Sequence, residues 1–257
     1  MEAPLYPQLS SDPSLPDPTY WVSPRHLAGD DDALADRVGA ALSAADWWMW
    51  PTARDTLLYV SPSGLCGAEW TRAACPFELG DLPVAWQVSS RSHSTSALPE
   101  WNAYFTAGVP HEALADFLRA LDVRPDPASS FDGPETVLAA VCAQGWARDI
   151  DRPHSAAIAP GLSAGISLEE VPPLVRDADP RPGQFGWQAW AEPAVDGPYL
   201  WCASFSAGVP HDLVAIFAAA LASLHPVPRS TLPAGAEGRL TVIRPGVDWR
   251  RRARGSE

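Results

Sequence analysis

The chain has 257 residues, of which 46% are hydrophobic, and this length and composition are sufficient for substantial buried cores. The formal net charge of −13 at pH 7 argues against a broad binding surface for nucleic acid or anionic lipid, because an acidic protein repels both. The four cysteines form no CxxC pair and the six histidines show no ligand spacing, so we expect no metal site and no cofactor.

The sequence also bears on where the protein resides. The N-terminus shows no basic segment followed by an apolar one, which a secretion signal requires. The longest apolar run, from Leu213 to Leu224, has about 12 residues and is too short to span a bilayer. We therefore expect a cytoplasmic protein with reduced cysteines and no membrane partner.

The first part of the chain predicts an arm followed by one structural unit. Residues 1–19 are rich in proline, serine and aspartate and predict a disordered arm. We assign residues 20–122 to the first unit, which begins with a short strand at Tyr20–Val22 and a helix at Ala33–Ala45. Alternating apolar residues then predict a series of strands, at residues 47–50, 56–60, 65–70, 84–88 and 101–106.

One stretch of the sequence occurs twice. Residues 101–112 read WNAYFTAGVPHE, and residues 201–212 repeat the pattern as WCASFSAGVPHD. In each copy an aromatic alternation predicts a strand, a glycine ends it, and a proline opens a helix, where its missing N–H costs nothing. Apolar residues then recur at helical spacing in both copies. The repetition of strand, turn and amphipathic helix indicates a duplicated unit.

The second unit follows a proline-containing linker. We assign residues 123–134 to the linker and residues 135–226 to the second unit, which opens with a shorter helix. In this unit we expect Trp146 to take the place that Trp48 has in the first unit. Residues 227–257 form a C-terminal extension with one further predicted strand, at Arg239–Ile243, and a basic tail.

These elements together predict the fold class. We expect an α+β protein with two tandem homologous units, each an antiparallel sheet covered by helices. We further expect the two units to pack side by side as an internal pseudo-dimer, with a shared sheet surface or a cleft between them.

Both units share a tryptophan-containing strand, a Trp-x-x-x-Phe strand, and a proline that opens a Phe-x-x-x-Leu helix. The first unit also has a Ser-Pro turn, which has decayed to Ala-Pro-Gly in the second unit. In the first unit these are Ser61, Pro62, Trp86, Trp101, Phe105, Pro110, Phe117 and Leu121, and in the second Ala159, Pro160, Gly161, Trp187, Trp201, Phe205, Pro210, Phe217 and Leu221. With these landmarks the chain resembles an actinobacterial family, domain of unknown function 317 or SPDY. The resemblance implies tandem repeats and a genomic position near mobile or conjugative elements, and it implies no known reaction.

One motif has the form of a catalytic site. Gly161–Gly165 reads G-x-S-x-G, the pattern of a nucleophile elbow, in which Ser163 would be the nucleophile. That elbow requires a strand before it and a helix after it, whereas the residues from Ile166 onward read as a strand. We therefore interpret the motif as a glycine-rich turn and keep a hydrolase that uses Ser163 as an alternative.

The start of each repeated helix carries a histidine next to an acid, His111–Glu112 and His211–Asp212. An acid suits the helix dipole at this position, and the same dipole lowers the pKa of a histidine. Because adjacent helical residues do not face each other, we expect surface and capping roles and no dyad. The two histidines would form a shared site only if they converged in the pseudo-dimer.

The chain has 12 tryptophans, and most of them recur at matched positions in the two units. We therefore expect the matched residues in the cores. Trp50 and Trp190 lack a counterpart, so we predict that they are exposed and available for binding. The basic tail, with Arg250, Arg251 and Arg252, is a further candidate contact.

The sequence therefore predicts a non-enzymatic binding or interaction module whose partner is another protein with a basic face. The alternative is a nucleic-acid-associated protein of an actinobacterial mobile or conjugative element, which would use exposed tryptophan and arginine. The acidic charge disfavours this alternative. The sequence predicts no particular oligomeric state.

Overall fold

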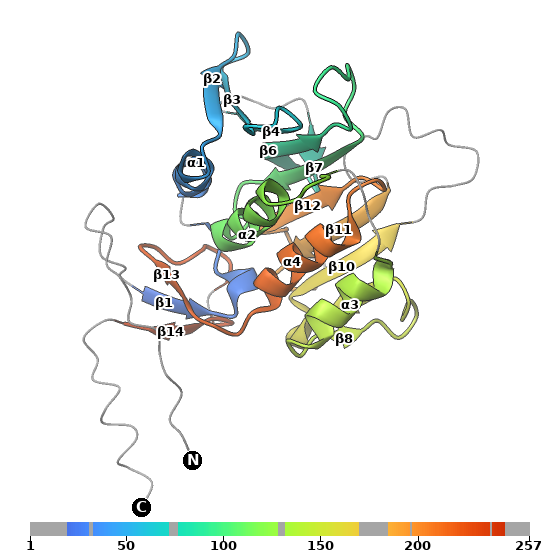
Figure 1. Ribbon diagram of the computed structural model, residues 1–257. Helices are drawn as coiled ribbons and strands as arrows, with labels where there is room; N and C mark the ends of the chain where they lie inside the picture. Colours follow the sequence, from blue (N-terminus) through green and yellow to red (C-terminus); the bar gives the residue numbers. More distant parts are fainter. Residues whose placement is uncertain are drawn as a thin grey trace, which may run out of the picture.

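The computed structural model describes residues 20–30, 33–71, 77–127, 132–169, 185–195, 197–236 and 238–244 (Figure 1). The predicted N-terminal arm and basic tail lie outside these residues, as does the middle of the predicted linker. Among the described residues, no helix combines the length and the apolar composition that a membrane span needs.

The described chain forms an α+β fold with two antiparallel sheets. The helices are α1 (Leu34–Ala44), α2 (His111–Asp122), α3 (Pro134–Cys142) and α4 (His211–Ala222), with short 3-10 turns at η1 (Arg25–Leu27) and η2 (Pro160–Leu162). The strands of the large sheet are β2 (Trp48–Pro51), β3 (Thr56–Val60), β4 (Cys66–Thr71), β5 (Glu78–Leu79), β6 (Leu82–Ser90), β7 (Trp101–Thr106), β8 (Ala147–Arg148), β9 (Ala156–Ile158), β10 (Ala164–Glu169), β11 (Gly186–Ala191) and β12 (Trp201–Phe205). The small sheet contains β1 (Tyr20–Ser23), β13 (Val227–Arg229) and β14 (Thr241–Ile243).

The large sheet is continuous across the two units. Its strand order is β2-β3-β4-β6-β7-β12-β11-β10-β9-β8, with β5 paired to β6. Strands of the first unit therefore fill one half of the sheet and strands of the second unit fill the other half. The two halves meet where β7 pairs with β12, so the repeated Trp-x-x-x-Phe strands lie side by side at the centre.

Equivalent residues of the two units make equivalent contacts across the central strand pair. Tyr104 lies opposite Ser204, its own counterpart in the repeat. The backbone N–H of Cys202 donates to the Thr106 hydroxyl at 2.8 Å, and the N–H of Asn102 donates to the Ser206 hydroxyl at 3.0 Å. The hydroxyl residue at the end of each repeated strand thus accepts a hydrogen bond from the backbone of the other strand.

The core lies between the large sheet and the helices, which run along one face of it (Figure 1). The matched tryptophans are almost completely buried there, which confirms the prediction: these are Trp86, Trp101, Trp187 and Trp201. At the centre the ring of Phe205 contacts those of Phe105 at 5.5 Å and Phe217 at 5.1 Å. Aromatic burial of this kind is the main favourable contribution to such a core.

The predicted match of Trp146 with Trp48 is wrong by one residue. The backbone N–H of Trp47 donates to the carbonyl of Leu42 at the end of α1, and that of Trp146 donates to Val141 at the end of α3. Trp47 and Trp146 are both buried, whereas Trp48 is 58% exposed. Because side chains alternate along a strand, a shift of one residue moves a side chain to the opposite face.

The small sheet joins the two ends of the described chain. Strand β1 lies between β13 and β14 and is antiparallel to both. Strands β1 and β14 fall where the sequence predicted them, whereas β13 was not predicted. The C-terminal extension is therefore packed against the beginning of the chain.

Candidate functional site

Strand β2 presents the largest cluster of exposed aromatic surface in the described residues. Trp48 is 58% exposed, Met49 50% and Trp50 46%. The strand lies at the edge of the large sheet, where it pairs with β3 alone. The rings of Trp48 and Trp50 meet edge to face at 5.9 Å between centroids, so they form one apolar strip. The exposure of Trp50 agrees with the sequence prediction.

The exposure predicted for Trp190 is not found. Its side chain is half-buried and does not form an open aromatic surface. Across the β10–β11 pair it lies opposite Gly165, and its indole ring covers the space where a side chain at that position would be. The ring also packs against the cluster of Leu79, Val84, Tyr104 and Cys202. Gly165 on the neighbouring strand thus leaves space for the indole ring. The sequence around Trp190 does not reveal this space.

The large sheet has a second face that carries no described helix. Residues directly opposite each other on neighbouring strands share a face, and one such row crosses the sheet from β2 to β9. The row consists of Trp50, Leu58, Glu69, Gln87, Tyr104, Ser204, Gln188, Ser167 and Ala156. It begins at the exposed aromatic strand and continues through mainly polar residues, of which Tyr104, Ser204, Ser167 and Ala156 are buried.

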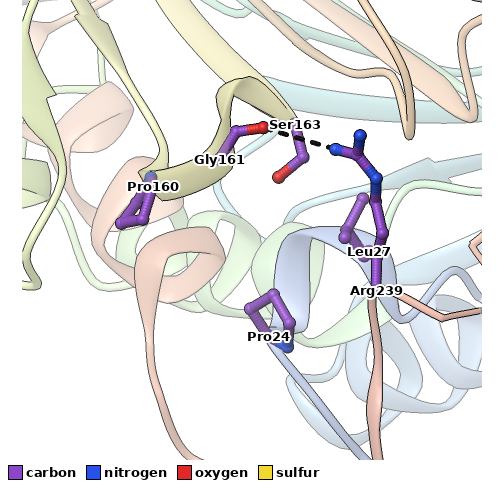
Figure 2. A pocket seen from close by; sticks show the side chains of 6 residues that line it. All are labelled: Pro24, Leu27, Pro160, Gly161, Ser163 and Arg239. Atoms are coloured by element: carbon purple, nitrogen blue, oxygen red, sulfur yellow. Dashed lines mark hydrogen bonds between the residues drawn. The ribbon is translucent and has the colours of Figure 1, made fainter.

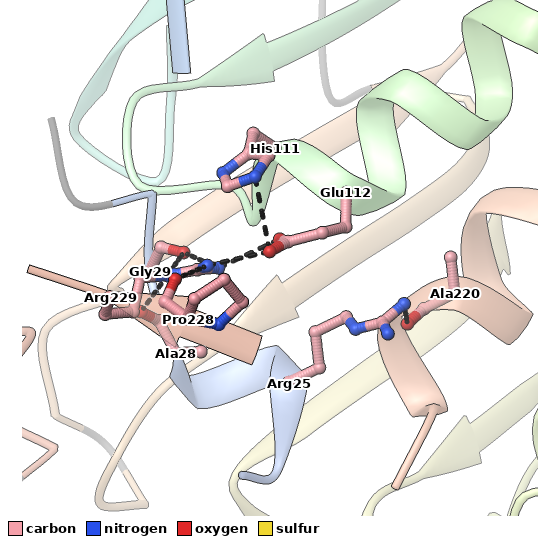
Figure 3. A network of polar contacts seen from close by, with 8 residues as sticks. All are labelled: Arg25, Ala28, Gly29, His111, Glu112, Ala220, Pro228 and Arg229. Carbon is pink, nitrogen blue, oxygen red and sulfur yellow. Dashed lines mark hydrogen bonds and ion pairs between the residues drawn. The ribbon is translucent and has the colours of Figure 1, made fainter. Parts of the chain in front are cut away.

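His111 lies in a buried polar network that ties α2 to the C-terminal extension (Figure 3). Its Nε2 is 3.3 Å from Oε1 of Glu112, and Glu112 accepts two hydrogen bonds from Arg229, at 2.7 and 2.9 Å. The prediction that adjacent residues would not meet is therefore wrong at this helix start. Burial lowers the pKa of His111 to about 4, so the ring is neutral at pH 7.

The charge of Glu112 is stabilised by the same network. Burial alone would raise the pKa of Glu112, but the hydrogen bonds and charge of Arg229 lower it below its ordinary value. Arg229 has a completely buried side chain, and its guanidinium also donates to the carbonyls of Ala28, Gly29 and Pro228. The network thus has a structural role: it connects the start of α2 to the C-terminal extension and to the residues after η1.

The repeated histidine of the second unit has different partners. The Nδ1 atom of His211 accepts a hydrogen bond from the indole N–H of Trp187 at 2.9 Å. Its neighbour Asp212 pairs with Arg124, which follows α2 of the first unit. Burial lowers the pKa of His211. The two histidines therefore occupy unlike surroundings although their sequence contexts repeat.

Ser163 lies in a turn and not in a nucleophile elbow. The 3-10 turn η2 precedes it and strand β10 follows it, as the sequence interpretation required. The serine is buried, and its Oγ is 3.0 Å from Nε2 of the buried His26. Burial lowers the pKa of His26 to about 4. The two residues are 137 positions apart, so no local sequence signal connects them.

A cavity of about 360 Å³ adjoins Ser163 (Figure 2). Its lining residues are Pro24, Leu27, Pro160, Gly161, Ser163 and Arg239. Among the described residues, no group of three or more histidine, cysteine, aspartate or glutamate side chains is placed to hold a metal ion. The tail residues Arg250, Arg251 and Arg252 lie outside the described part of the chain.

Comparison with known proteins identifies the repeated unit. Residues 60–128 and 173–227 each match SPDY, a domain of unknown function (DUF317). The chain carries two SPDY domains. No curated protein and no solved structure matches it.

The two SPDY matches contain the core elements that the two units have in common, and other features of the chain lie outside the matched residues. The first match includes β7 and α2 and the second includes β12 and α4, so both contain the buried tryptophans and the phenylalanine cluster. Strand β2 lies before the first SPDY match, and Ser163 lies between the two matches. The exposed aromatic strip and the residues that line the Ser163 cavity thus lie outside the two matched segments.

Proposed function

We propose that this SPDY protein is a non-enzymatic binding module whose partner is another protein. The exposed strip of Trp48 and Trp50 on strand β2 carries this proposal. Large aromatic side chains are enriched at the energetic centres of protein interfaces, and a sheet edge offers unpaired backbone groups to a second strand. Monomeric proteins usually cover or charge such an edge.

We propose further that the two units form an internal pseudo-dimer. The pairing of Tyr104 with Ser204 supports this arrangement, because it places a pseudo-two-fold axis beside that residue pair. Close approach at the turns supports it as well, since Gly108 lies against Leu200 and Gly208 lies against Glu100. In such an arrangement the outer strands β2 and β8 occupy opposite ends of one sheet.

The charge of the chain indicates the chemistry of the partner. The whole chain carries a net charge of −13, so a partner with a basic face is attracted to the protein before it reaches the aromatic strip. The partner then gains apolar contact with the two indole rings. We therefore propose a basic protein surface with an apolar centre.

A binding comparison between three forms of the full chain tests this proposal. The forms are wild type, the double variant Trp48→Ser/Trp50→Ser, and the control Ile150→Ser, which changes a residue that is 95% exposed elsewhere. We expect wild type and the control to retain a partner from a native-host lysate, and the double variant to bind it at least about 30-fold more weakly. Equal retention by all three forms would contradict the proposal.

The same proteins distinguish the nucleic-acid alternative from a protein partner. A gel-shift titration at low salt with single-stranded and double-stranded DNA measures nucleic-acid binding directly. We expect no shift for wild type. A salt-sensitive shift that the double variant loses would favour the nucleic-acid-associated reading and a role for the β2 tryptophans in base stacking.

A further inference from the structure

The cavity beside Ser163 lies where three distant parts of the chain meet. Pro24 and Leu27 come from the segment of η1, Pro160 and Ser163 from the turn before β10, and Arg239 from the residues before β14. Its volume of about 360 Å³ falls within the range of small-molecule sites. The walls are mostly apolar, with Ser163 and Arg239 as the polar side chains among the lining residues (Figure 2).

The tautomer of the buried His26 sets the direction of its hydrogen bond with Ser163. His26 is 3% exposed, and its Nδ1 has no hydrogen-bond partner among the described residues. A neutral ring carries one proton, and a proton on Nδ1 would leave a buried N–H without an acceptor. A proton on Nε2 donates instead to Ser163 Oγ, at 3.0 Å. In that tautomer the ring is a donor toward Ser163 and does not serve as its base.

This direction leaves the hydroxyl hydrogen of Ser163 available to the cavity. A serine hydroxyl accepts and donates independently, so acceptance from His26 does not use its own hydrogen. Arg239 supplies further donors at the same place. One of its five N–H groups donates to the carbonyl of Gly161 at 3.3 Å, and no other hydrogen bond holds the guanidinium within the described part of the chain.

The equivalent position of the first unit shows that the fold does not require a serine here. Strand β4 aligns with β10, and in that alignment Leu65 takes the place of Ser163. The carbonyl of Leu65 accepts the N–H of Arg91, just as the carbonyl of Ser163 accepts the N–H of Glu192. The backbone hydrogen bond therefore forms with either residue at this position. The buried hydroxyl of Ser163 has no equivalent at Leu65 in the first unit.

We propose that this cavity binds a small organic carboxylate. The Ser163 hydroxyl and the Arg239 guanidinium donate to the carboxylate oxygens, and the apolar part of the ligand lies against Pro24, Leu27 and Pro160. Hydrogen bonds to a carboxylate from a charged donor are about twice as strong as those between neutral groups, which favours an anion over a neutral analogue. The site is independent of the aromatic strip on β2.

Titration of the full chain with benzoate, acetate and butyrate, followed by NMR and calorimetry, tests the proposal. We expect benzoate to bind with one-to-one stoichiometry and benzyl alcohol, its neutral analogue, not to compete. Arg239→Gln should weaken benzoate binding at least about tenfold, because it removes a charge-assisted hydrogen bond. Arg119→Gln is the control for charge, since Arg119 is exposed on α2.

Ser163→Ala should weaken benzoate binding similarly, with Ser167→Ala on the following strand β10 as the control. Equal affinity of Arg239→Gln and wild type would overturn the proposal, as would the failure of all three carboxylates to bind at millimolar concentration. Long-range ¹⁵N–¹H NMR correlations of His26 provide a second, independent test. We expect the proton on Nε2; a proton on Nδ1 would mean that Ser163 donates to His26, and would overturn the arrangement.

Discussion

Arg229 is the residue through which the C-terminal extension is fixed to the rest of the molecule. Its side chain is fully buried, donates to both carboxylate oxygens of Glu112, and satisfies the carbonyls of Ala28 and Gly29 (Figure 3). A buried charge is tolerated when it is paired and fully hydrogen-bonded, and this residue meets both conditions. No local sequence pattern indicates this connection, because Arg229 and Glu112 are 117 residues apart.

Replacement of this arginine by an apolar residue should destabilise the protein strongly. We expect Arg229→Met to lower the free energy of unfolding by about 3–5 kcal/mol, because it leaves the Glu112 carboxylate buried without its partner. Urea unfolding at pH 7 measures the loss. The double variant Arg229→Met/Glu112→Leu should recover part of it, since no unpaired charge then remains.

A matched arginine on the surface provides the control for this prediction. Arg119 pairs with Asp116 one turn earlier on α2, and its side chain is 64% exposed. Solvent screens such a pair, so Arg119→Met should change the free energy of unfolding by less than about 1 kcal/mol. Similar losses in Arg119→Met and Arg229→Met would show that burial of the Arg229 network contributes little.

At the scale of elements, the turn after each repeated strand is held by close backbone contact between the two units. Gly108 has φ +87°, and a Cβ added there would lie 2.6 Å from the carbonyl oxygen of Leu200. Gly145, after α3, has a similar φ of +93° with no heavy atom within 4 Å of an added Cβ. The two glycines therefore share a backbone conformation and differ in the space around them.

This difference predicts unequal effects of alanine at the two positions. Gly145→Ala should cost about 1 kcal/mol, the penalty for a side chain in the left-handed region. Gly108→Ala should cost about 1–3 kcal/mol more, because it also forces the central strands apart. Chemical denaturation of both variants measures the difference. Equal losses would indicate that the turn shifts easily and that the contact with Leu200 is not tight.

Most helices and strands were predicted from the sequence because their signals are local. The alternation of Trp101, Ala103 and Phe105 and the proline that precedes α2 lie within a few residues of the elements they specify. Strand β13 escaped prediction because Pro228 stands at its centre, and proline is tolerated only at a sheet edge. The strand occupies such an edge beside β1, which the local sequence does not reveal.

The candidate sites were predicted less completely, because their geometry depends on distant residues. Exposure of Trp50 followed from the absence of a counterpart in the repeat, and the structure agrees. The same argument failed for Trp190, because Gly165 on the neighbouring strand makes room for its ring. The partnership of His26 with Ser163 required the fold itself, since these residues come from different units.

At the scale of the whole molecule, the two SPDY domains share one core. The ring of Phe205 contacts Phe105 and Phe117 of the first unit as well as Phe217 of its own, at centroid distances of 5.1 to 5.7 Å. The central strands are also hydrogen-bonded to each other. The hydrophobic core is therefore continuous between the two domains. We expect the described part of the chain to unfold in one cooperative transition.

The variant Phe205→Ala tests this cooperativity. Removal of a fully buried phenylalanine ring should cost about 3–5 kcal/mol. If the units share one core, native-state hydrogen exchange should show the same loss of protection in β6 of the first unit as in β11 of the second. Ile216→Ala, on the exposed side of α4, is the control and should leave both strands near their wild-type protection. Loss of protection confined to β10 and β11, with β4 and β6 unchanged, would show that the two domains unfold independently.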